Sequence, residues 1–452
     1  MKSRNLKQTL LLPVLLFSLF IIAFAFTTIR FHEKPKQVVR CCNNPDANHT
    51  CIMKTIFGLD TSKDGTDPNS FVPPPLVVAA ITKGLDWMEK AQGNDGGWGS
   101  GSHYNQGLMD PHAVPSDPAT TSLVGMALLR SGITLQKGNY AANLKKATEF
   151  LLKAVEQCSD DQQYLTTLTN TQPQIKLGRN IDVILTAQFF TNLLRYELND
   201  APLKKRVEKN LDKCIGRIQK GQDVDGGWKD GGWAPVLQSA LANNALESAQ
   251  EVGRDVDSTV MTRSHEYQNG NFDVNTKSAV TGKSAGVVLY SLSGTTRASA
   301  KHARKADDFL TKAKKDGKLK KEDKVTEENL RIAGASAPEA RELYTAYQVN
   351  QASRNEAMRS DVMEGFGSNG GEEFLSYLMT GESMVMQAGN EWKTWYDMMT
   401  GKLVKIQNND GSWNGHHCIT SPVFCTGTCL LILSIHNDMQ FSIQPGQNKK
   451  GF

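Results

Sequence analysis

The stretch Gln92-Gly93-Asn94-Asp95-Gly96-Gly97-Trp98 returns twice, as Gln222-Asp223-Val224-Asp225-Gly226-Gly227-Trp228 and as Gln407-Asn408-Asn409-Asp410-Gly411-Ser412-Trp413. Each copy stands between two segments with helical periodicity, so it is a joint between helices. Glycine permits a tight turn, aspartate accepts from free backbone N–H groups, and the glutamine amide reaches helix-end groups beside the indole ring. Degenerate copies stand at Gln172-Pro173 and at Gln268-Asn269-Gly270-Asn271-Phe272. The repeat predicts an all-α fold of consecutive helix pairs, in which the motif has a structural role.

The repeat resembles the QW motif of the terpenoid cyclases and protein prenyltransferases, over roughly residues 76 to 436. The resemblance implies an α/α toroid, in which six inner helices alternate along the chain with six outer helices. Segments that are apolar around most of their circumference are the expected inner helices: 117–131, 182–194, 234–249, 276–292, 371–386 and 421–434. Amphipathic segments rich in Lys and Glu are expected outer helices: 139–156, 203–220 and 391–406.

The fifth pair fits this scheme poorly, because residues 301–370 between two inner helices exceed what one outer helix requires. We therefore expect an insertion there. Residues 297–324 hold 11 Lys or Arg against five acidic residues. This basic segment is either a patch for anionic lipid or a protein partner, or a solvated outer helix with a charged loop.

The N-terminal segment has the features of a membrane-inserting sequence. Lys2, Arg4 and Lys7 precede an apolar, uncharged run over residues 10–29, which is long enough to cross a bilayer. Residues 1–33 are thus either a transmembrane anchor or a signal peptide, and 34–75 are a polar linker. Both interpretations predict that the body, residues 76–436 with a tail at 437–452, is extracytoplasmic, either membrane-anchored or secreted.

Composition and missing motifs exclude several function classes. Hydrophobic residues make up 39% of the chain and the formal net charge is only +4, so the body is globular and nucleic acid is not the expected partner. The Asp-x-Asp-Asp acid motif of squalene-type cyclases is absent, which argues against a protonating terpene cyclase. Asp212-Lys213-Cys214 matches the prenyltransferase zinc spacing, but it precedes a QW turn where the family's pair follows one, so we interpret the match as accidental.

The candidate chemistry lies near the C-terminus. His416, His417 and Cys418 immediately precede the last inner helix, and Cys425 lies one turn into it. Imidazole and thiolate ligands so close together suit Zn²⁺. The alternatives are a loop held by ordinary hydrogen bonds and a disulfide between Cys418 and Cys425.

Two carboxylates, Glu372 and Glu373, open the preceding inner helix. In a closed toroid the last two inner helices are neighbours, so we expect these catalytic candidates to meet the His/Cys group at one rim. Parallel inner helices place their N-termini at that same rim. Asp117, Asp182 and the two glutamates can therefore equally serve to satisfy helix ends.

Three hypotheses remain open from the sequence, and it does not decide whether the chain is an enzyme. The first is a toroid that binds a lipid-like ligand or a protein without catalysis. The second is a metal-dependent enzyme that acts on an isoprenoid or another lipid-like substrate. The third is a carbohydrate-active toroid in which Glu372 or Glu373 is the acid or base. Residues 370–377 and 410–420 also resemble secreted bacterial proteins with QW repeats, but no activity comes with that resemblance.

Overall fold

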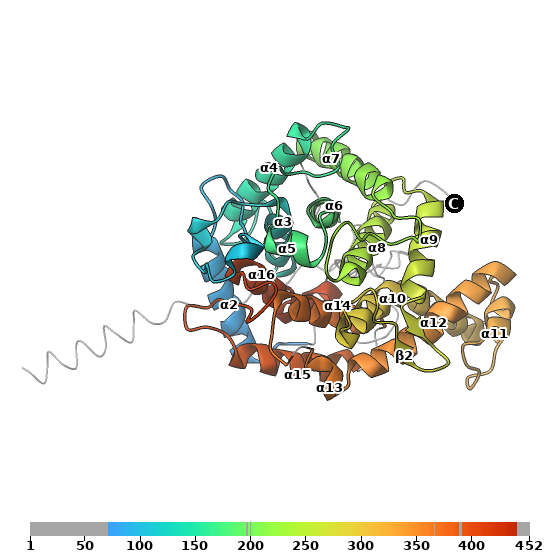
Figure 1. Ribbon diagram of the computed structural model, residues 1–452. Helices are drawn as coiled ribbons and strands as arrows, with labels where there is room; N and C mark the ends of the chain where they lie inside the picture. The colour runs from blue at the N-terminus through green and yellow to red at the C-terminus, as the bar shows by residue number, and fades with distance from the viewer. Residues whose placement is uncertain (1–70, 196–197, 199, 366, 388–390, 441–452) are drawn as a thin grey trace, which may run out of the picture. The chain divides into compact units, whose positions relative to one another are not determined.

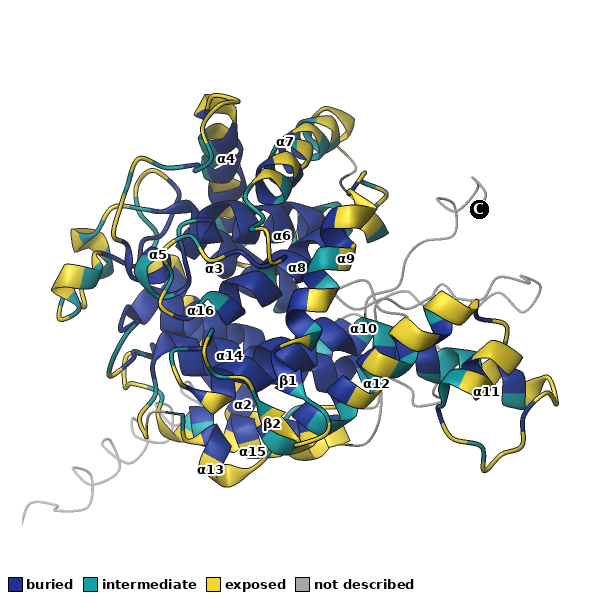
Figure 2. Cartoon of the chain, turned by 45° about the vertical axis from the view of Figure 1, so that its right-hand side comes forward, coloured by how far each residue is buried: buried dark blue, intermediate teal, exposed yellow. Residues whose placement is uncertain are grey.

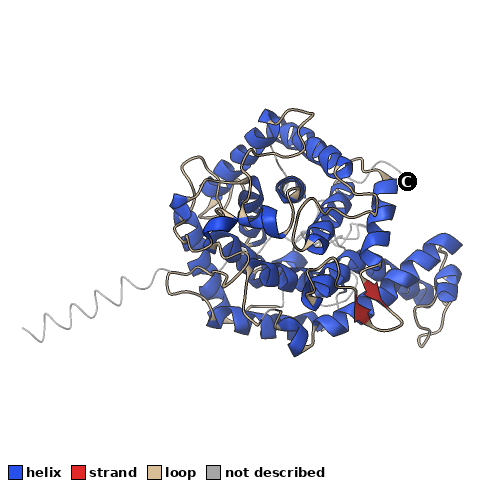
Figure 3. Cartoon of the chain, viewed as in Figure 1, coloured by secondary structure: helices blue, strands red, loops and turns tan. Residues whose placement is uncertain are grey.

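The computed structural model describes residues 71–195, 198, 200–365, 367–387 and 391–440, which all belong to one compact unit, Thr50–Ile443. This part of the chain is predominantly helical, and its strands are the short antiparallel pair β1 (Phe272–Asp273) and β2 (Ser278–Ala279) (Figure 3). The all-α prediction is confirmed. Across the described ranges, every helix is too short or too polar to cross a membrane. The expected anchor or signal segment, most of the linker and most of the tail lie outside the described residues.

The helices have the following bounds in chain order: α2 Pro75–Lys90, η2 His103–Asn105, η3 Pro111–Ala113, α3 Pro118–Arg130, α4 Ala141–Gln157, α5 Gln172–Lys176, α6 Ile181–Arg195, α7 Ala201–Lys220, α8 Pro235–Glu251, α9 Ser258–Asn269, α10 Val288–Lys315, α11 Glu327–Ile332, α12 Ala337–Ala357, α13 Ser360–Met363, α14 Gly371–Gln387, α15 Glu391–Lys405, α16 Pro422–Leu433 and η4 Ile435–Gln440. Five of the six expected inner helices, and all three expected outer helices, appear within a few residues of their predicted bounds.

The inner helices are α3, α6, α8, α10, α14 and α16, and each packs against the next in a cycle that α16 closes by packing against α3. Each inner helix also packs against at least one flanking helix, from the set α4, α7, α9, α12, α15 and α2 (Figure 1). Figure 2 shows burial concentrated on the inner helices and exposure on the flanking ones. The sequence explains this difference. Every residue of α3 and α16 is buried, whereas α7 buries only one stripe with Val207, Leu211, Cys214 and Ile218 at helical spacing.

The three complete joints repeat the same hydrogen bonds, and all three tryptophans are fully buried. Each indole Nε1 donates to the carbonyl ten residues earlier: Trp98 to Met88 (3.0 Å), Trp228 to Ile218 (2.7 Å) and Trp413 to Leu403 (2.9 Å). Each glutamine Nε2 donates once within its turn and once to the next flanking helix: Gln92 to Asn143 (2.9 Å), Gln222 to Val260 (2.9 Å) and Gln407 to Ala80 (2.9 Å). The predicted structural role of the motif is confirmed, because each joint satisfies carbonyls at helix ends and ties consecutive flanking helices together.

The third joint fastens the last helices to the first. Besides the bond from Gln407 to Ala80, the indole Nε1 of Trp87 in α2 donates to the Asp410 carboxylate at 3.1 Å. Gly411 has a φ of +98°, and a Cβ on it would lie 2.5 Å from the Lys83 carbonyl oxygen, so only glycine permits this contact. The two ends of the helical body are therefore held by side chains as well as by packing.

The prediction of an inner helix over 276–292 is wrong. Residues 272–279 form the β1–β2 hairpin, whose turn is organised by the Asp273 carboxylate accepting from the backbone N–H groups of Asn275 and Thr276. Positive φ values at Lys277 and Ala285 prevent a helix from passing through this segment. The helix starts only at Val288, and α10 then continues to Lys315, because helix formers follow without a glycine or proline to stop it after Gly294.

The expected insertion at 301–370 is a helical hairpin made by the second half of α10, α11 and the first half of α12 (Figure 1). It has an apolar cluster of its own, separate from the main core: Ala306, Leu310, Ala313, Leu319, Val325, Leu330, Ala335, Ala340 and Leu343. Its tip carries exposed lysines at 312, 315, 318, 320, 321 and 324. We call this segment, residues 301–343, the basic hairpin.

A buried charge network lies at the C-terminal ends of the inner helices. The guanidinium of Arg130 donates to the carboxylates of Asp438 (2.9 Å) and Glu382 (3.0 Å). Glu382 also accepts from Nε of Arg297 at 3.0 Å. All four side chains are at most 5% exposed, so these ion pairs link α3, α10, α14 and η4 inside the body.

Candidate functional site

Two of the carboxylates at the inner-helix N-termini are helix caps. Asp117 accepts from the backbone N–H of Thr120 at 2.8 Å and from the N–H and hydroxyl of Ser100. Asp182 accepts from the N–H groups of Leu165 (2.9 Å) and Val183 (2.7 Å). Burial raises the pKa of Asp182 to about 7 despite these bonds. The interpretation of these two aspartates as groups that satisfy helix ends is confirmed.

Glu372 and Glu373 lie at the start of α14 and are completely buried. One oxygen of Glu373 accepts from the Tyr290 hydroxyl at 2.6 Å, and the other accepts from the Gly370 N–H at 2.8 Å. Glu372 accepts from the Ile419 N–H at 3.1 Å through Oε2, and its Oε1 has no hydrogen-bond partner within the described part of the chain. Glu373 is therefore fully engaged, whereas one oxygen of Glu372 is available.

The rim that the sequence predicted brings some of the His and Cys candidates to these carboxylates. His417 Nε2 lies 3.5 Å from Glu373 Oε2 and 2.9 Å from the Ser368 carbonyl oxygen. The Cys425 thiol donates to the Ile419 carbonyl at 3.5 Å, beside the N–H that Glu372 binds. His416 is exposed instead, and its backbone N–H donates to Asn369.

The close approach of these elements depends on Gly370. A Cβ there would lie 2.8 Å from the His417 carbonyl oxygen and 2.9 Å from Glu373 Oε2. Cys418 follows in the left-handed region with a φ of +58°, which is uncommon for a cysteine. The loop before α16 is thus folded tightly onto the start of α14.

Helix α5 covers this rim from the other side. Gln172, at its first position, accepts from the backbone N–H groups of Thr420 (2.7 Å) and Ser421 (3.0 Å) and so satisfies the N-terminus of α16. Gln172-Pro173 was expected to be a degenerate QW turn, but these residues begin α5 and reach across to another helix. Lys176, at the end of α5, is close enough for its charge to act on Glu372 and Cys418.

Burial controls the protonation of the rim. It raises the pKa of Glu372 to about 8, with repulsion from Glu373 adding to the effect and the Ile419 N–H and Lys176 opposing it. Burial likewise raises the pKa of Cys418 to about 12, and that of Cys425 well above its ordinary value. Glu372 is therefore a neutral carboxylic acid at pH 7, and neither cysteine is a thiolate nucleophile there.

The five cysteines of the described ranges, including Cys418 and Cys425, are free thiols. Among the described residues, the side chains of His416, His417, Cys418 and Cys425 do not form a group of three ligand atoms within 4.8 Å of one another. Zinc binding at this rim therefore stays a prediction for metal analysis.

A cavity of about 30 Å³ lies between the inner helices of the described body. Leucines and methionines of α3, α6 and α14 form most of its wall, and polar groups at one end include Gln188, Asn192, Asn244, Arg130 and Glu382. A space of this size holds about one water molecule, whereas sites for organic ligands measure roughly 300–1,000 Å³.

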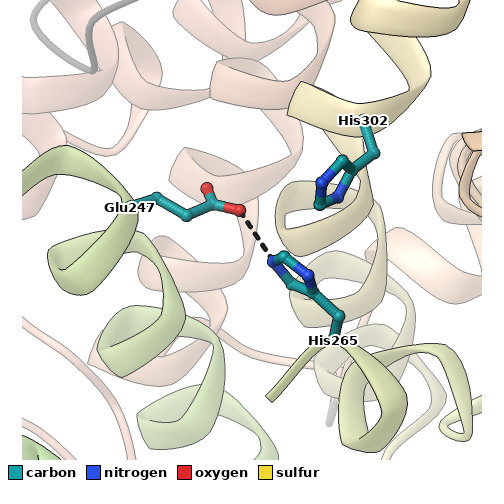
Figure 4. A group of neighbouring side chains, drawn as sticks. All are labelled: Glu247, His265 and His302. Atoms are coloured by element: carbon teal, nitrogen blue, oxygen red, sulfur yellow. Dashed lines mark hydrogen bonds and ion pairs between the residues drawn. The ribbon is translucent and has the colours of Figure 1, made fainter. Parts of the chain in front are cut away.

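A second cluster of ionisable side chains was missed by sequence reasoning. Glu247 in α8, His265 in α9 and His302 in α10 come together beside Glu342 of α12 (Figure 4). Their ligand atoms lie within 4.8 Å of one another. No motif joins these residues, since 55 positions separate the first from the last. The sequence carries no local signal for this cluster, because only the fold brings α8, α9 and α10 together here.

The cluster is strongly coupled. Burial opposes charge on His265, but the carboxylates of Glu247 and Glu342 outweigh it and raise its pKa to about 9. Burial and the neighbouring His265 lower the pKa of His302 to about 4. The pKa of Glu247 falls to about 2, because His265, Lys301 and His302 outweigh the effect of its burial.

Comparisons with known proteins do not place the chain in a family, because no family model matches it and no curated protein matches it.

Proposed function

We propose that the chain is an α/α toroid of the terpenoid cyclase and prenyltransferase type, and that it binds a protein partner instead of turning over a substrate between its inner helices. The observation that carries the proposal is the small size of the cavity found between the inner helices, which at about 30 Å³ has no room for an isoprenoid or a sugar. The closed cycle of inner helices, each with a flanking helix, supports the toroid. An extracytoplasmic body held by residues 1–33 belongs to the same proposal.

The basic hairpin is the proposed binding element. It extends beyond the cycle of helix pairs, has its own apolar cluster and presents a lysine-rich tip. A protruding element with a lysine-rich tip favours a partner with an acidic surface, because complementary charge accelerates encounter and suppresses wrong partners. The buried ends of α10 and α12 contact the main body, so a partner bound at the tip would be held at a fixed distance from it.

Site-specific photocrosslinking in cells that express the full chain tests this proposal. A photoreactive amino acid at position 318, on the hairpin tip, should give a discrete crosslinked protein, whereas the same group at the exposed position 145 of α4 should not. Replacing Lys318, Lys320 and Lys321 by Glu should abolish the adduct, and replacing Lys145 and Lys146 by Glu should leave it. Equal labelling from both positions would contradict the proposal, as would consumption of farnesyl diphosphate or squalene by the purified chain.

Glu372 supports a second candidate function, an acid-catalysed reaction at the rim. A buried carboxylic acid that is neutral at pH 7 and has one oxygen without a partner is a feature of general acids. The substrate would then be a lipid-like molecule or a glycan, with Glu373 or a zinc ion at His417 and Cys418 beside it. A substrate screen of the full chain would favour this candidate if turnover were lost in Glu372→Gln and kept in Glu328→Gln, which alters an exposed residue of α11.

A further inference from the structure

The cluster of Glu247, His265 and His302 lies where the basic hairpin leaves the inner helices. Four helices contribute to it, because Glu342 of α12 stands next to the two imidazoles. The imidazole rings are perpendicular, with centroids 4.4 Å apart. Figure 4 shows the three side chains converging on a common space.

The distances in this cluster match those between ligands of a tetrahedral metal ion. Zn²⁺ binds imidazole nitrogen and carboxylate oxygen at about 2.0–2.2 Å, which places neighbouring ligand atoms roughly 3.3–3.6 Å apart. Glu247 Oε1 lies 3.2 Å from His265 Nε2, and one ligand atom from each of the three residues lies within 4.8 Å of the others. The Glu247–His265 spacing is therefore that of two ligands on one ion, and a ligand atom of His302 lies within 4.8 Å of both.

We propose that Glu247, His265 and His302 bind one divalent transition-metal ion of the zinc class, and that Glu342 positions His265 for it. Two imidazoles and one carboxylate are a ligand set that Zn²⁺ prefers, and three protein ligands leave a fourth position for water or for a group from a partner. This site is independent of the proposed protein-binding function and of the rim at Glu372.

Glu342 is positioned to orient the His265 ring. His265 uses Nε2 toward Glu247, and its Nδ1 lies 3.5 Å from Glu342 Oε1. Histidines that bind metals usually donate their second N–H to a carboxylate or carbonyl, which fixes the tautomer and the ring plane. Glu342 thus supports the ring that the ion would use, and it is half exposed, so solvent ions can reach the site.

The surrounding charges permit a cation. Lys301 is the nearest ammonium group, and it pairs with Glu251 at 2.7 Å. Glu247 and Glu342 both lie next to His265, so a bound cation would have two carboxylates beside it. A bound ion would also stabilise the fold, because it would link α8 and α9 to α10 at the base of the basic hairpin.

Binding of Co²⁺ to the chelator-treated full chain tests the site. Tetrahedral Co²⁺ absorbs in the visible range, and Zn²⁺ should displace it with a stoichiometry near one. Glu342→Gln should weaken binding roughly 10- to 100-fold, and His302→Gln should weaken it by more than that. His112→Gln, at an exposed histidine of η3, should bind as the unaltered chain does, and so should the double variant His417→Ala with Cys418→Ser.

Melting of the metal-free variants separates loss of a ligand from loss of the fold. If His302→Gln melts well below the unaltered chain without metal, Glu342→Gln decides the result, since it alters a half-exposed side chain. An increase in melting temperature with Zn²⁺ that is absent in Glu247→Gln would support the site. Absence of Co²⁺ binding, or binding that survives His302→Gln and disappears in the His417 and Cys418 double variant, would overturn it.

Discussion

Replacing Trp413 by Ala tests whether the QW joints hold the helices together. The indole is completely buried and its Nε1 donates to the Leu403 carbonyl at the end of α15. Its backbone N–H donates to the Thr426 hydroxyl at 2.8 Å, which fixes the joint to α16. The ring also contacts α2, since a Cβ on Gly84 would lie 3.0 Å from it. The indole thus contacts α15 and α2, and the backbone of the same residue binds α16.

The expected cost follows from these contacts. Removal of a fully buried tryptophan side chain costs roughly 3–5 kcal/mol, against a total stability of about 5–15 kcal/mol for a domain. Trp413→Phe keeps most of the packing and removes the indole hydrogen bond to the Leu403 carbonyl, which still accepts from the Ile406 N–H, so we expect it to cost about 0.5–1.5 kcal/mol. Because this joint connects α15 and α16 to α2, the loss of local stability should be greatest in these three helices.

Denaturant unfolding of the full chain in detergent measures the cost, and hydrogen exchange locates it. Trp413→Ala should speed amide exchange in α2, α15 and α16 before it affects α7 and α8. Trp233→Ala is the matched control, because that ring is 42% exposed, and it should change the free energy of unfolding by about 0.5 kcal/mol or less. If Trp413→Ala lowered the free energy of unfolding no more than this control does, or if amide exchange in α2 were unchanged, the joints would not hold the helices together as argued above.

Three further predictions concern other parts of the body. Trypsin should cut the exposed lysines between Asp316 and Thr326 of the basic hairpin, and the two fragments should still elute together, because α10 and α14 pack across the cut; separate elution would contradict a single body. The raised pKa of Glu372 means that its contribution to stability is complete below about pH 4.5 and is lost as the pH rises to about 8, so Glu372→Gln should flatten the pH dependence of the unfolding midpoint in that range. Glu382→Gln removes the carboxylate shared by Arg130 and Arg297, and equilibrium unfolding should show a loss of roughly 3–5 kcal/mol, whereas a change below 1 kcal/mol would show that the network is dispensable.

Local chemistry decided which parts of the fold could be predicted. The joints could be predicted from the sequence because their Gln, Asp, Gly and Trp residues lie within seven positions, and each has a role that follows from its side chain. The hydroxyl groups that bind the tryptophan backbone could not be predicted from the sequence. Thr121, Ser239 and Thr426 each donate back to the tryptophan backbone from the next inner helix, at spacings of 23, 11 and 13 residues.

The start of α10 was mispredicted because apolar periodicity does not reveal backbone conformation. The apolar residues of 276–287 led us to expect a helix, but the turn at Asp273 and the positive φ at Ala285 prevent one from forming there. The candidate rim shows the same limit. Sequence order indicated that Glu373 and His417 lie near each other, but the contribution of Lys176 required the fold, since α5 reaches the rim from another repeat.

The place where the repeat breaks is also the place where new chemistry appears. In the degenerate joint at 268–272, Phe272 replaces tryptophan. Within the described residues, both polar atoms of the buried Gln268 side chain have no hydrogen-bond partner, unlike the glutamines of the three complete joints. The helix before this joint carries His265, and the helix after it is the one that extends into the basic hairpin and carries His302. Natural proteins give up local consistency mainly at functional sites. The unpartnered Gln268, the long α10 and the His–Glu cluster therefore mark one region of the body as the part most adapted to function, and the Co²⁺ titration and the hairpin crosslinks test two independent roles for it.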